Sequence, residues 1–317
     1  MKNLLKKARF AAAAILFTAL PANAFAYNLF VDKNNTSGLE DGSQTSPFDT
    51  IGEAIAAAAL LDENSRDIFI ANGTYEEDVE LVEKVSLTGE SRGGVIITDS
   101  GTVIKMAHST KLKKLTVSGG TIGINIPKDS KATITDVAVK KAKKVGIQAE
   151  KGSTSDRYRV TVEDSKITDG KGKGFYILKG RVSLKNNEIE DNDEEGVDIR
   201  AGVKGTISKN TIASNGESGI ELVLGKTSLK IQKNKIKNND ASGITNQFYK
   251  DDKQLGNVLI SKNNVRSNDS YGINCATPSG GSPGSEYWKK TITLSGNLFF
   301  GNEKPIAGRC KIEVAVK

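Results

Sequence analysis

The sequence predicts an all-β fold in which the chain winds into a stack of short coils built from parallel strands. Glycines that open short apolar–polar alternations recur with steps of 22, 23, 24 and 29 residues, at Gly174, Gly196, Gly219, Gly243 and Gly272. Each unit holds two or three alternating runs separated by turn residues, with no room for a helix. Self-similarity at a period of about 20–50 residues is typical of stacked-repeat architectures.

A second observation is the asparagine pattern that accompanies each unit. An asparagine stands shortly before an apolar residue and another asparagine, as in Asn187, Ile189 and Asn192. Asparagine tolerates left-handed backbone and bonds nearby main chain, and stacked copies can bond one another. We interpret these residues as a structural ladder rather than as glycosylation or metal sites: Asn187, Asn210, Asn234, Asn264 and Asn297.

The alternation predicts which side chains point inward. Residues two apart in a strand share one face, so each run has an inner and an outer set. One unit alone has too little interior to bury its apolar set, but parallel stacking at about 4.8 Å buries it. Two interior columns are expected: Ile189, Ile212, Ile236, Val265 and Leu298, and Phe175, Val197, Ile220, Ile244 and Ile273.

These repeats resemble the right-handed parallel β-helices of the pectin-lyase-like group, with their asparagine ladder. The resemblance implies a single-stranded right-handed parallel β-helix, or β-solenoid, of roughly ten coils. The region from Phe48 through Gly89 also resembles the opening of many extracellular β-helix proteins, including pectin esterases. The catalytic Asp and Arg segments of those esterases have no match here, so no specific enzyme family is indicated.

Residues 1–26 are predicted to be a secretory signal peptide. A basic start with Lys2, Lys6, Lys7 and Arg9 precedes a short apolar run, and Ala24–Ala26 offers a small-x-small cleavage site. The alternative is an uncleaved anchor helix. Cleavage after Ala26 would make the protein secreted, periplasmic or attached to the cell surface, with no integral membrane segment in the mature chain.

Residues 27–66 are expected to close the first coil. A strand at 28–32 and a turn-rich loop precede apolar residues at helical spacing, from Ile51 to Leu61, with Asp49 or Thr50 as N-cap. Such a helix would cover the open edge of the stack. Residues 67–317 are expected to form the β-helix itself, with an insertion near 276–290.

The C-terminal region carries the two cysteines and the only tryptophan. Cys275 and Cys310 are able to close one disulfide in an exported chain, the alternative being two free thiols. The insertion contains Tyr287 and Trp288, which would either stack on sugar rings or pack back onto the coil. A last strand at 312–316 would seal the far end.

Charge gives little reason to expect a nucleic-acid partner. The chain has 45 Lys plus Arg and 38 Asp plus Glu, and four basic residues lie in the predicted leader, which leaves 41 − 38 = +3. With one histidine and no paired cysteine motif, no metal site of the zinc type is expected. A local basic outer face is either a solvated surface or a stripe for an acidic polysaccharide; it centres on Lys140, Lys141, Lys143 and Lys144.

The second residue after each opening glycine should form one outward column. It contains Asp198 and Glu221 on adjacent coils, about 5 Å apart, with Arg200 beside Asp198. Two carboxyl groups at this separation suit glycosidic cleavage, and their mutual repulsion would raise one pKa. In the polysaccharide lyases that share the fold, carboxylates hold calcium and a basic residue removes a proton, so the resemblance implies catalytic Asp198, Glu221 and Arg200 with Ca²⁺.

Two functions follow from these patterns. The first is an exported, non-catalytic protein that binds a polysaccharide or cell-surface glycan without a cofactor, through Tyr176, Gln247, Asn274, Tyr287 and Trp288. The alternative is a calcium-assisted lyase or a glycoside hydrolase that uses the outward column. The signature motifs of the lyases and polygalacturonases are missing, which favours binding over catalysis.

Overall fold

The computed structural model of the 317-residue chain describes residues 27–251, 254–281, 283–310 and 312. The predicted leader and nearly all of the predicted strand at 312–316 lie outside the described residues. Within the described part, no helix combines the length and the apolar character needed to cross a membrane.

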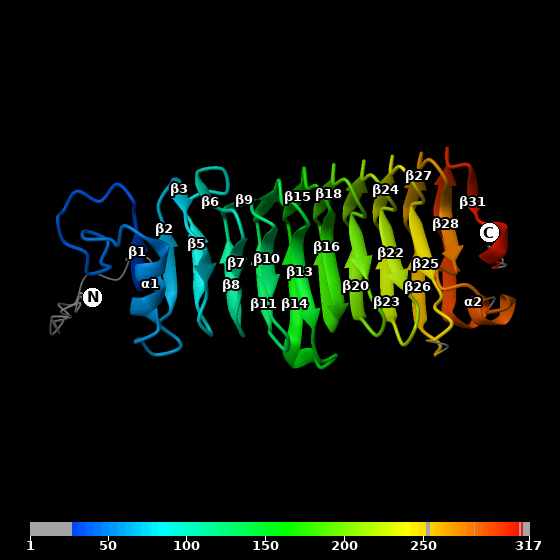
Figure 1. Ribbon diagram of the computed structural model, residues 1–317, viewed down its shortest axis with the longest axis horizontal. Coiled ribbons are helices and arrows are strands. Elements are labelled where there is room, and N and C mark those ends of the chain that lie inside the picture. Colours follow the sequence, from blue (N-terminus) through cyan, green and yellow to red (C-terminus); the bar gives the residue numbers. More distant parts are fainter. Residues whose placement is uncertain (1–26, 252–253, 282, 311, 313–317) are drawn as a thin grey trace, which may run out of the picture.

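The chain forms an elongated right-handed β-helix with three parallel sheets along its length (Figure 1). We call them the long sheet, the face sheet and the third sheet. They contain 11, 10 and 10 strands, and each coil adds one strand to each sheet in turn. The predicted all-β parallel fold class is therefore confirmed.

The long sheet begins with β1 near the N-terminal end of the described chain. Its strands are β1 (Leu29–Val31), β2 (Asp67–Ile70), β5 (Ser86–Gly89), β8 (Thr110–Lys113), β11 (Ala132–Thr135), β14 (Arg159–Glu163), β17 (Arg181–Lys185), β20 (Lys204–Ser208), β23 (Ser228–Gln232), β26 (Asn257–Ser261) and β29 (Ile292–Ser295).

The face sheet carries the strands that follow the opening glycines. They are β4 (Val79–Glu80), β7 (Thr102–Lys105), β10 (Ile122–Ile126), β13 (Val145–Lys151), β16 (Lys173–Lys179), β19 (Val197–Ile199), β22 (Ile220–Val223), β25 (Ile244–Gln247), β28 (Tyr271–Ala276) and β31 (Lys304–Ile306).

The third sheet contains the strands that follow the first asparagine of each unit. They are β3 (Gly73–Glu76), β6 (Val95–Asp99), β9 (Thr116–Gly119), β12 (Ala138–Lys140), β15 (Lys166–Thr168), β18 (Glu188–Glu190), β21 (Thr211–Ala213), β24 (Lys235–Lys237), β27 (Asn264–Arg266) and β30 (Leu298–Phe300).

Helix α1 (Ile51–Ala58) covers the N-terminal end, as the sequence predicted. Thr50 is its N-cap, and the Thr50 hydroxyl accepts a hydrogen bond from the Glu53 N–H. The Glu77 carboxylate also accepts from the N–H groups of Ile51 and Gly52, each at 3.0 Å, where the helix dipole favours negative charge. The apolar face of α1 is buried against β1 and β2, so the first coil has no exposed open core.

Both predicted interior columns exist, with one correction. Phe175, Val197, Ile220, Ile244 and Ile273 pair in register across five strands of the face sheet. In the third sheet, Ile189, Ile212, Ile236 and Val265 also pair in register, but the next partner is Phe299 rather than Leu298. Leu298 is 63% exposed. Its side chain points outward because alternation assigns the inner position to the residue after it.

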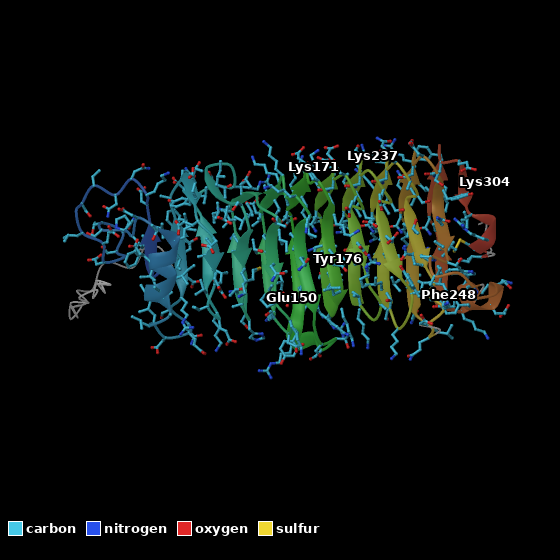
Figure 2. All side chains as sticks on the ribbon, viewed as in Figure 1. Glu150, Lys171, Tyr176, Lys237, Phe248 and Lys304 are labelled. Carbon is cyan, nitrogen blue, oxygen red and sulfur yellow. A yellow bond between two sulfur atoms is a disulfide. The ribbon has the colours of Figure 1, made fainter. Side chains whose placement is uncertain are left out.

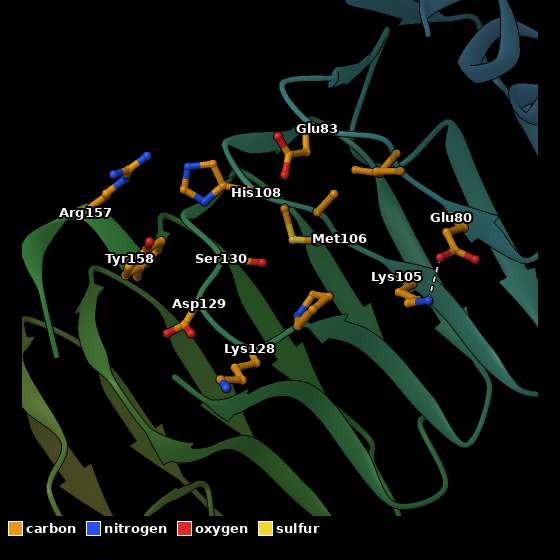
Figure 3. A pocket seen from close by; sticks show the side chains of 13 residues that line it. Glu80, Glu83, Lys105, Met106, His108, Lys128, Asp129, Ser130, Arg157 and Tyr158 are labelled. Atoms are coloured by element: carbon orange, nitrogen blue, oxygen red, sulfur yellow. Dashed lines mark hydrogen bonds and ion pairs between the residues drawn. The ribbon is translucent and has the colours of Figure 1, made fainter. Parts of the chain in front are cut away.

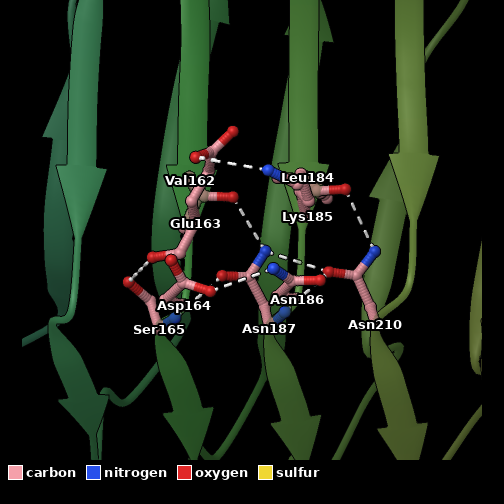
Figure 4. A network of polar contacts seen from close by, with 9 residues as sticks. All are labelled: Val162, Glu163, Asp164, Ser165, Leu184, Lys185, Asn186, Asn187 and Asn210. Carbon is pink, nitrogen blue, oxygen red and sulfur yellow. Dashed lines mark hydrogen bonds and ion pairs between the residues drawn. The ribbon is translucent and has the colours of Figure 1, made fainter.

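The asparagines form two ladders rather than one. In the first, each side-chain amide donates to the Oδ1 of its copy on the next coil, at 2.9–3.0 Å, through Asn187, Asn210, Asn234, Asn263 and Asn297. The second contains Asn192, Asn215, Asn239, Asn268 and Asn302. Each amide also donates to a main-chain carbonyl, as Asn187 and Asn210 show in Figure 4.

The structure corrects the sequence prediction for the ladder at one position. Asn263, not Asn264, occupies the first ladder, and Asn264 opens β27. The left-handed turn geometry that we attributed to the ladder residues belongs instead to the residue before each of them. Residues in that position with positive φ include Asn186, Lys209, Lys233 and Lys262.

The C-terminal coil is closed by a disulfide and a short helix. Cys275 in β28 is bonded to Cys310, which ends the 3₁₀ turn Gly308–Cys310, so the predicted disulfide is confirmed. The insertion contains α2 (Ser285–Thr291). Tyr287 and Trp288 are only 8% and 3% exposed, and both pack edge-to-face against Phe248. Of the two alternatives for these aromatics, the structure shows packing onto the coil, which leaves little of either ring accessible to a sugar.

Shortening one interior side chain should test the column assignment. We expect Ile236→Ala to lower the free energy of unfolding by about 2–5 kcal/mol, because the buried side chain leaves a cavity. Leu298→Ala, on the exposed face of β30, should change it little. Urea denaturation of both variants measures the difference, and equal stabilities would contradict the assignment.

The neighbours Asn263 and Asn264 provide a matched test of the ladder. Asn263→Ala removes the acceptor for the backbone and side-chain N–H groups of Asn234 and the donor to the Ile231 carbonyl. We expect a loss of roughly 2 kcal/mol or more, since each orphaned buried group costs about 1–3 kcal/mol. Asn264→Ala should lower the stability much less in the same measurement. A larger loss in Asn264→Ala than in Asn263→Ala would place Asn264 in the ladder, as the sequence predicted.

Candidate functional site

The outward residues of the face sheet form one continuous column, which we call the outer column. Its members pair in register from strand to strand: Lys105, Asn125, Gln148, Tyr176, Asp198, Glu221, Thr245 and Asn274. Asp198 on β19 is therefore the direct neighbour of Glu221 on β22, as the sequence predicted. Tyr176 lies midway along the face sheet (Figure 2).

Two cations hold Asp198 in place. The Arg200 Nη2 donates to Asp198 Oδ2 at 2.8 Å, and the Lys173 Nζ lies 3.2 Å from the same oxygen. Asp198 is 0% exposed, and its Oδ1 has no hydrogen-bond partner among the described residues. A buried carboxylate needs such cations because desolvation of an unpaired charge is costly. Asp198 therefore positions Arg200 and has no surface available to a bound sugar.

Lys173 and Glu195 complete the cluster, and sequence reasoning missed both. Lys173 lies just before Gly174, and Glu195 occupies the same place before Gly196, so the repeat stacks one on the other. The Lys173 ammonium donates to the Glu195 carboxylate and lies 3.1 Å from that of Glu194. The signal was present in the sequence, because the step between these glycines also relates residues 173 and 195.

Burial and charge spread the pKa values of the carboxyl groups. Burial, followed by the nearby charges of Glu195 and Asp198, raises the pKa of Glu221 to about 7, although Arg200 and Lys173 act in the opposite direction. Burial also raises the pKa of Asp198, although Arg200 and Lys173 oppose this. For Glu195, burial acts upward, but the Lys173 hydrogen bond and charge lower its pKa overall. A proton held near neutral pH therefore resides on Glu221.

The cluster fits a divalent cation poorly. Single carboxylate oxygens from Glu195, Asp198 and Glu221 lie within 4.8 Å of one another, and oxygen ligands suit Ca²⁺. However, the Lys173 ammonium already contacts Glu195 and Asp198, and Arg200 shares the Asp198 oxygen. These two cations already compensate the negative charge of the carboxylates, as a metal ion would, so we derive no step through calcium.

The remaining predicted binding residues differ in their surroundings. Tyr176 is half-buried, with the Arg200 guanidinium 5.6 Å from its ring centre. Asn274 is also half-buried, and its Oδ1 accepts from Arg309 at 2.7 and 3.1 Å. Gln247 is 7% exposed, which leaves little of it for a ligand. Of the lysines of the predicted basic face, Lys140 ends β12 and the others lie in the turn before β13. This turn lies next to the cluster, because the Lys144 carbonyl accepts from the Lys173 N–H at 3.0 Å.

The fold and the site define a parallel β-helix with a charged and polar outward column. Residues 122–299 match the family model "Right handed beta helix region", and the chain therefore belongs to this family. No curated protein sequence matches the chain.

Solved structures share the fold at low sequence identity. The pectin methylesterase from carrot is 13% identical, with a TM-score of 0.52 over 94% of this chain and 91% of that one. The pectate lyase Pel9A is 13% identical, with a TM-score of 0.50 over 91% and 77%. The A-module of the Azotobacter vinelandii mannuronan C-5 epimerase AlgE6 is 15% identical, with a TM-score of 0.43 over 81% and 90%. At these identities the likeness concerns the fold.

The raised pKa of Glu221 predicts a pH dependence of stability. An unfolded carboxyl group loses its proton near pH 4.5, whereas folded Glu221 keeps it until about pH 7. Between these values the folded state binds more protons, so this group makes the protein less stable as the pH rises. Glu221→Gln should remove that loss and flatten the melting temperature between about pH 4.5 and 7 relative to the natural chain. The exposed Glu76→Gln is the control, and identical pH profiles for all three proteins would contradict the assignment.

Proposed function

We propose that this protein is an exported β-helix that binds a polysaccharide or cell-surface glycan along its outer column and does not cleave it. The observation that supports this most is the unbroken register of polar side chains around the half-buried Tyr176. An extended glycan lying along the stack meets a new side chain at every coil, about 4.8 Å apart.

The chemistry of the outer column suits a sugar chain with acidic units. Gln148 and Asn274 supply hydrogen-bonding groups, and Tyr176 supplies a ring face with the Arg200 guanidinium beside it. Two fold relatives, the pectin methylesterase and the pectate lyase, are named for action on pectin and pectate. An acidic polysaccharide is therefore the partner that we propose first.

The burial of Asp198 favours binding over cleavage. Glycosidases place two carboxyl groups on either side of the scissile bond, about 5 Å or more apart. Asp198 is 0% exposed and is held by Arg200 and Lys173, so of the pair Asp198 and Glu221 a sugar on the face sheet reaches only Glu221. One accessible carboxyl group does not supply the pair that this chemistry needs.

One observation favours a second candidate, a polysaccharide-active enzyme. Glu221 is only partly buried, and its pKa of about 7 suits a group that gives and takes protons at neutral pH. In such an enzyme, a lyase or a glycoside hydrolase, Glu221 would be the catalytic residue and Asp198 would position Arg200.

Binding along the outer column can be measured with pectate, alginate and a neutral galactan. We expect Tyr176→Ala to weaken pectate binding in affinity electrophoresis by about tenfold, which corresponds to about 1.4 kcal/mol. Tyr249→Ala is the matched control, since Tyr249 lies beyond β25 and outside the outer column.

The same polymers decide between binding and catalysis. Release of reducing or unsaturated ends that disappears in Glu221→Gln would replace the binding proposal with the enzyme. For the non-catalytic protein we expect binding without any product. Tyr176→Ala should weaken this binding, and Tyr249→Ala should not.

A further inference from the structure

A hollow of about 450 Å³ lies beside the N-terminal part of the outer column, where the face sheet turns into the long sheet. Its volume falls within the range of about 300–1,000 Å³ that is common for small-molecule sites. Figure 3 shows His108, Tyr158 and Arg157 on one side, Lys128 and Asp129 below, and the Glu80–Lys105 pair opposite.

The hollow arises because successive coils connect the two sheets with segments of different length. Residues 106–109 join β7 to β8, 127–131 join β10 to β11, and 152–158 join β13 to β14. The longest of these ends in the 3₁₀ turn Asp156–Tyr158, which forms a wall, whereas Gly180 alone connects β16 to β17 in the next coil. The buried Leu81 and Met106 contribute apolar surface.

The two rings on the wall are arranged for contact with a sugar. The His108 and Tyr158 rings lie edge-to-face with centroids 5.6 Å apart, and the Arg157 guanidinium lies 5.7 Å from the Tyr158 centroid. The backbone N–H of Lys131 donates to His108 Nδ1 at 3.3 Å, so the neutral ring carries its proton on Nε2. His108 therefore presents one N–H donor to a ligand, beside an aromatic face that suits the C–H groups of a sugar.

The charged residues around the hollow provide both cations for a ligand carboxylate and hydrogen-bond acceptors for ligand hydroxyl groups. Lys105 is neutralised by Glu80 at 2.5 Å, and the Asp129 Oδ1 accepts from the Ser153 N–H at 2.6 Å. Lys128 and Arg157 have no ion pair with another described residue, so both can meet a ligand carboxylate. The second oxygen of Asp129 and the Glu83 carboxylate remain as acceptors for hydroxyl groups.

The hollow is continuous with the outer column through a shared residue. Lys105 belongs to both, because it lines the hollow and pairs in register with Asn125 in the outer column. The Glu150 carboxylate accepts from the Asn125 side chain at 3.0 Å and from the Lys128 N–H at 3.2 Å. A glycan on the outer column would therefore reach the hollow at its end.

We propose that the hollow binds one sugar-acid unit at the end of a glycan chain, with its carboxylate at Lys128 and Arg157 and its ring against Tyr158 and His108. This inference rests on the proposed function, since it identifies a site for the end of the glycan that the outer column binds.

His108 is the only histidine in the chain, so its ring signals in an NMR spectrum report on the hollow without ambiguity. We expect sodium galacturonate to shift these signals along a saturating curve. Galactose should bind about tenfold more weakly, and sodium acetate should give no saturation. Equal effects of galacturonate, galactose and acetate would overturn the proposal.

Charge removal tests the carboxylate contact. The double variant Lys128→Gln with Arg157→Gln should weaken galacturonate binding about tenfold, to the level of galactose. The control Lys113→Gln, an exposed lysine of β8 outside the hollow, should leave it unchanged. A double variant that binds galacturonate as the natural chain does would overturn the assignment.

The two proposals can fail separately. Tyr176→Ala should weaken pectate binding but leave the galacturonate titration of His108 unchanged. Saturation by galacturonate without any binding of pectate would reject the outer column and support the hollow. Binding of pectate with no response of His108 to galacturonate would do the reverse.

Discussion

The in-register pairing of each coil with the next is the constraint on which this structure depends. It turns residues about two dozen positions apart into neighbours, as with Ile212 and Ile236 in the third sheet. The buried asparagines make this pairing more specific, because each side-chain amide finds its hydrogen-bond partners, the next asparagine and a main-chain carbonyl on an adjacent coil, in this register. A slip of one residue would expose the apolar column and leave the amides unpaired, so the register is strongly specified.

The charged cluster follows from the same pairing. Stacking brings Glu195 over Lys173 and Asp198 beside Glu221. The strand register that builds every coil is sufficient to place these four residues together. Lys173 lowers the pKa of Glu195, and together with Arg200 it opposes the rise that burial causes at Asp198, whereas Glu221 has no direct ion pair among the described residues. Of Glu195, Asp198 and Glu221, the pKa is raised to about 7 at Glu221, which has no such ion pair and is only partly buried.

The sequence was sufficient for the fold and for the neighbours within the outer column, because alternation and period are local signals. It misassigned Asn264 because Asn263 and Asn264 are adjacent, and either choice preserves an asparagine before Val265. The same shift by one residue placed Leu298, rather than Phe299, in the interior column. Lys173 was not predicted because it precedes its glycine, whereas the predicted outward column consists of residues that follow the glycines. The burial of Tyr287 and Trp288 depends on Phe248 from another coil, a contact that no local pattern encodes.

The connections between strands carry what the repeat does not determine. The interior columns run with little change from β16 to β28, so the core offers few places where one coil differs from its neighbours. Variation collects instead at the turns, and the segment 152–158 is long enough to build a wall beside turns that are shorter. In a stack of similar coils, a recess requires such a difference in length, because equal turns would leave a ridge of constant height. A site that selects one end of a long ligand therefore belongs at this change, where the otherwise uniform surface gains a position unlike the rest.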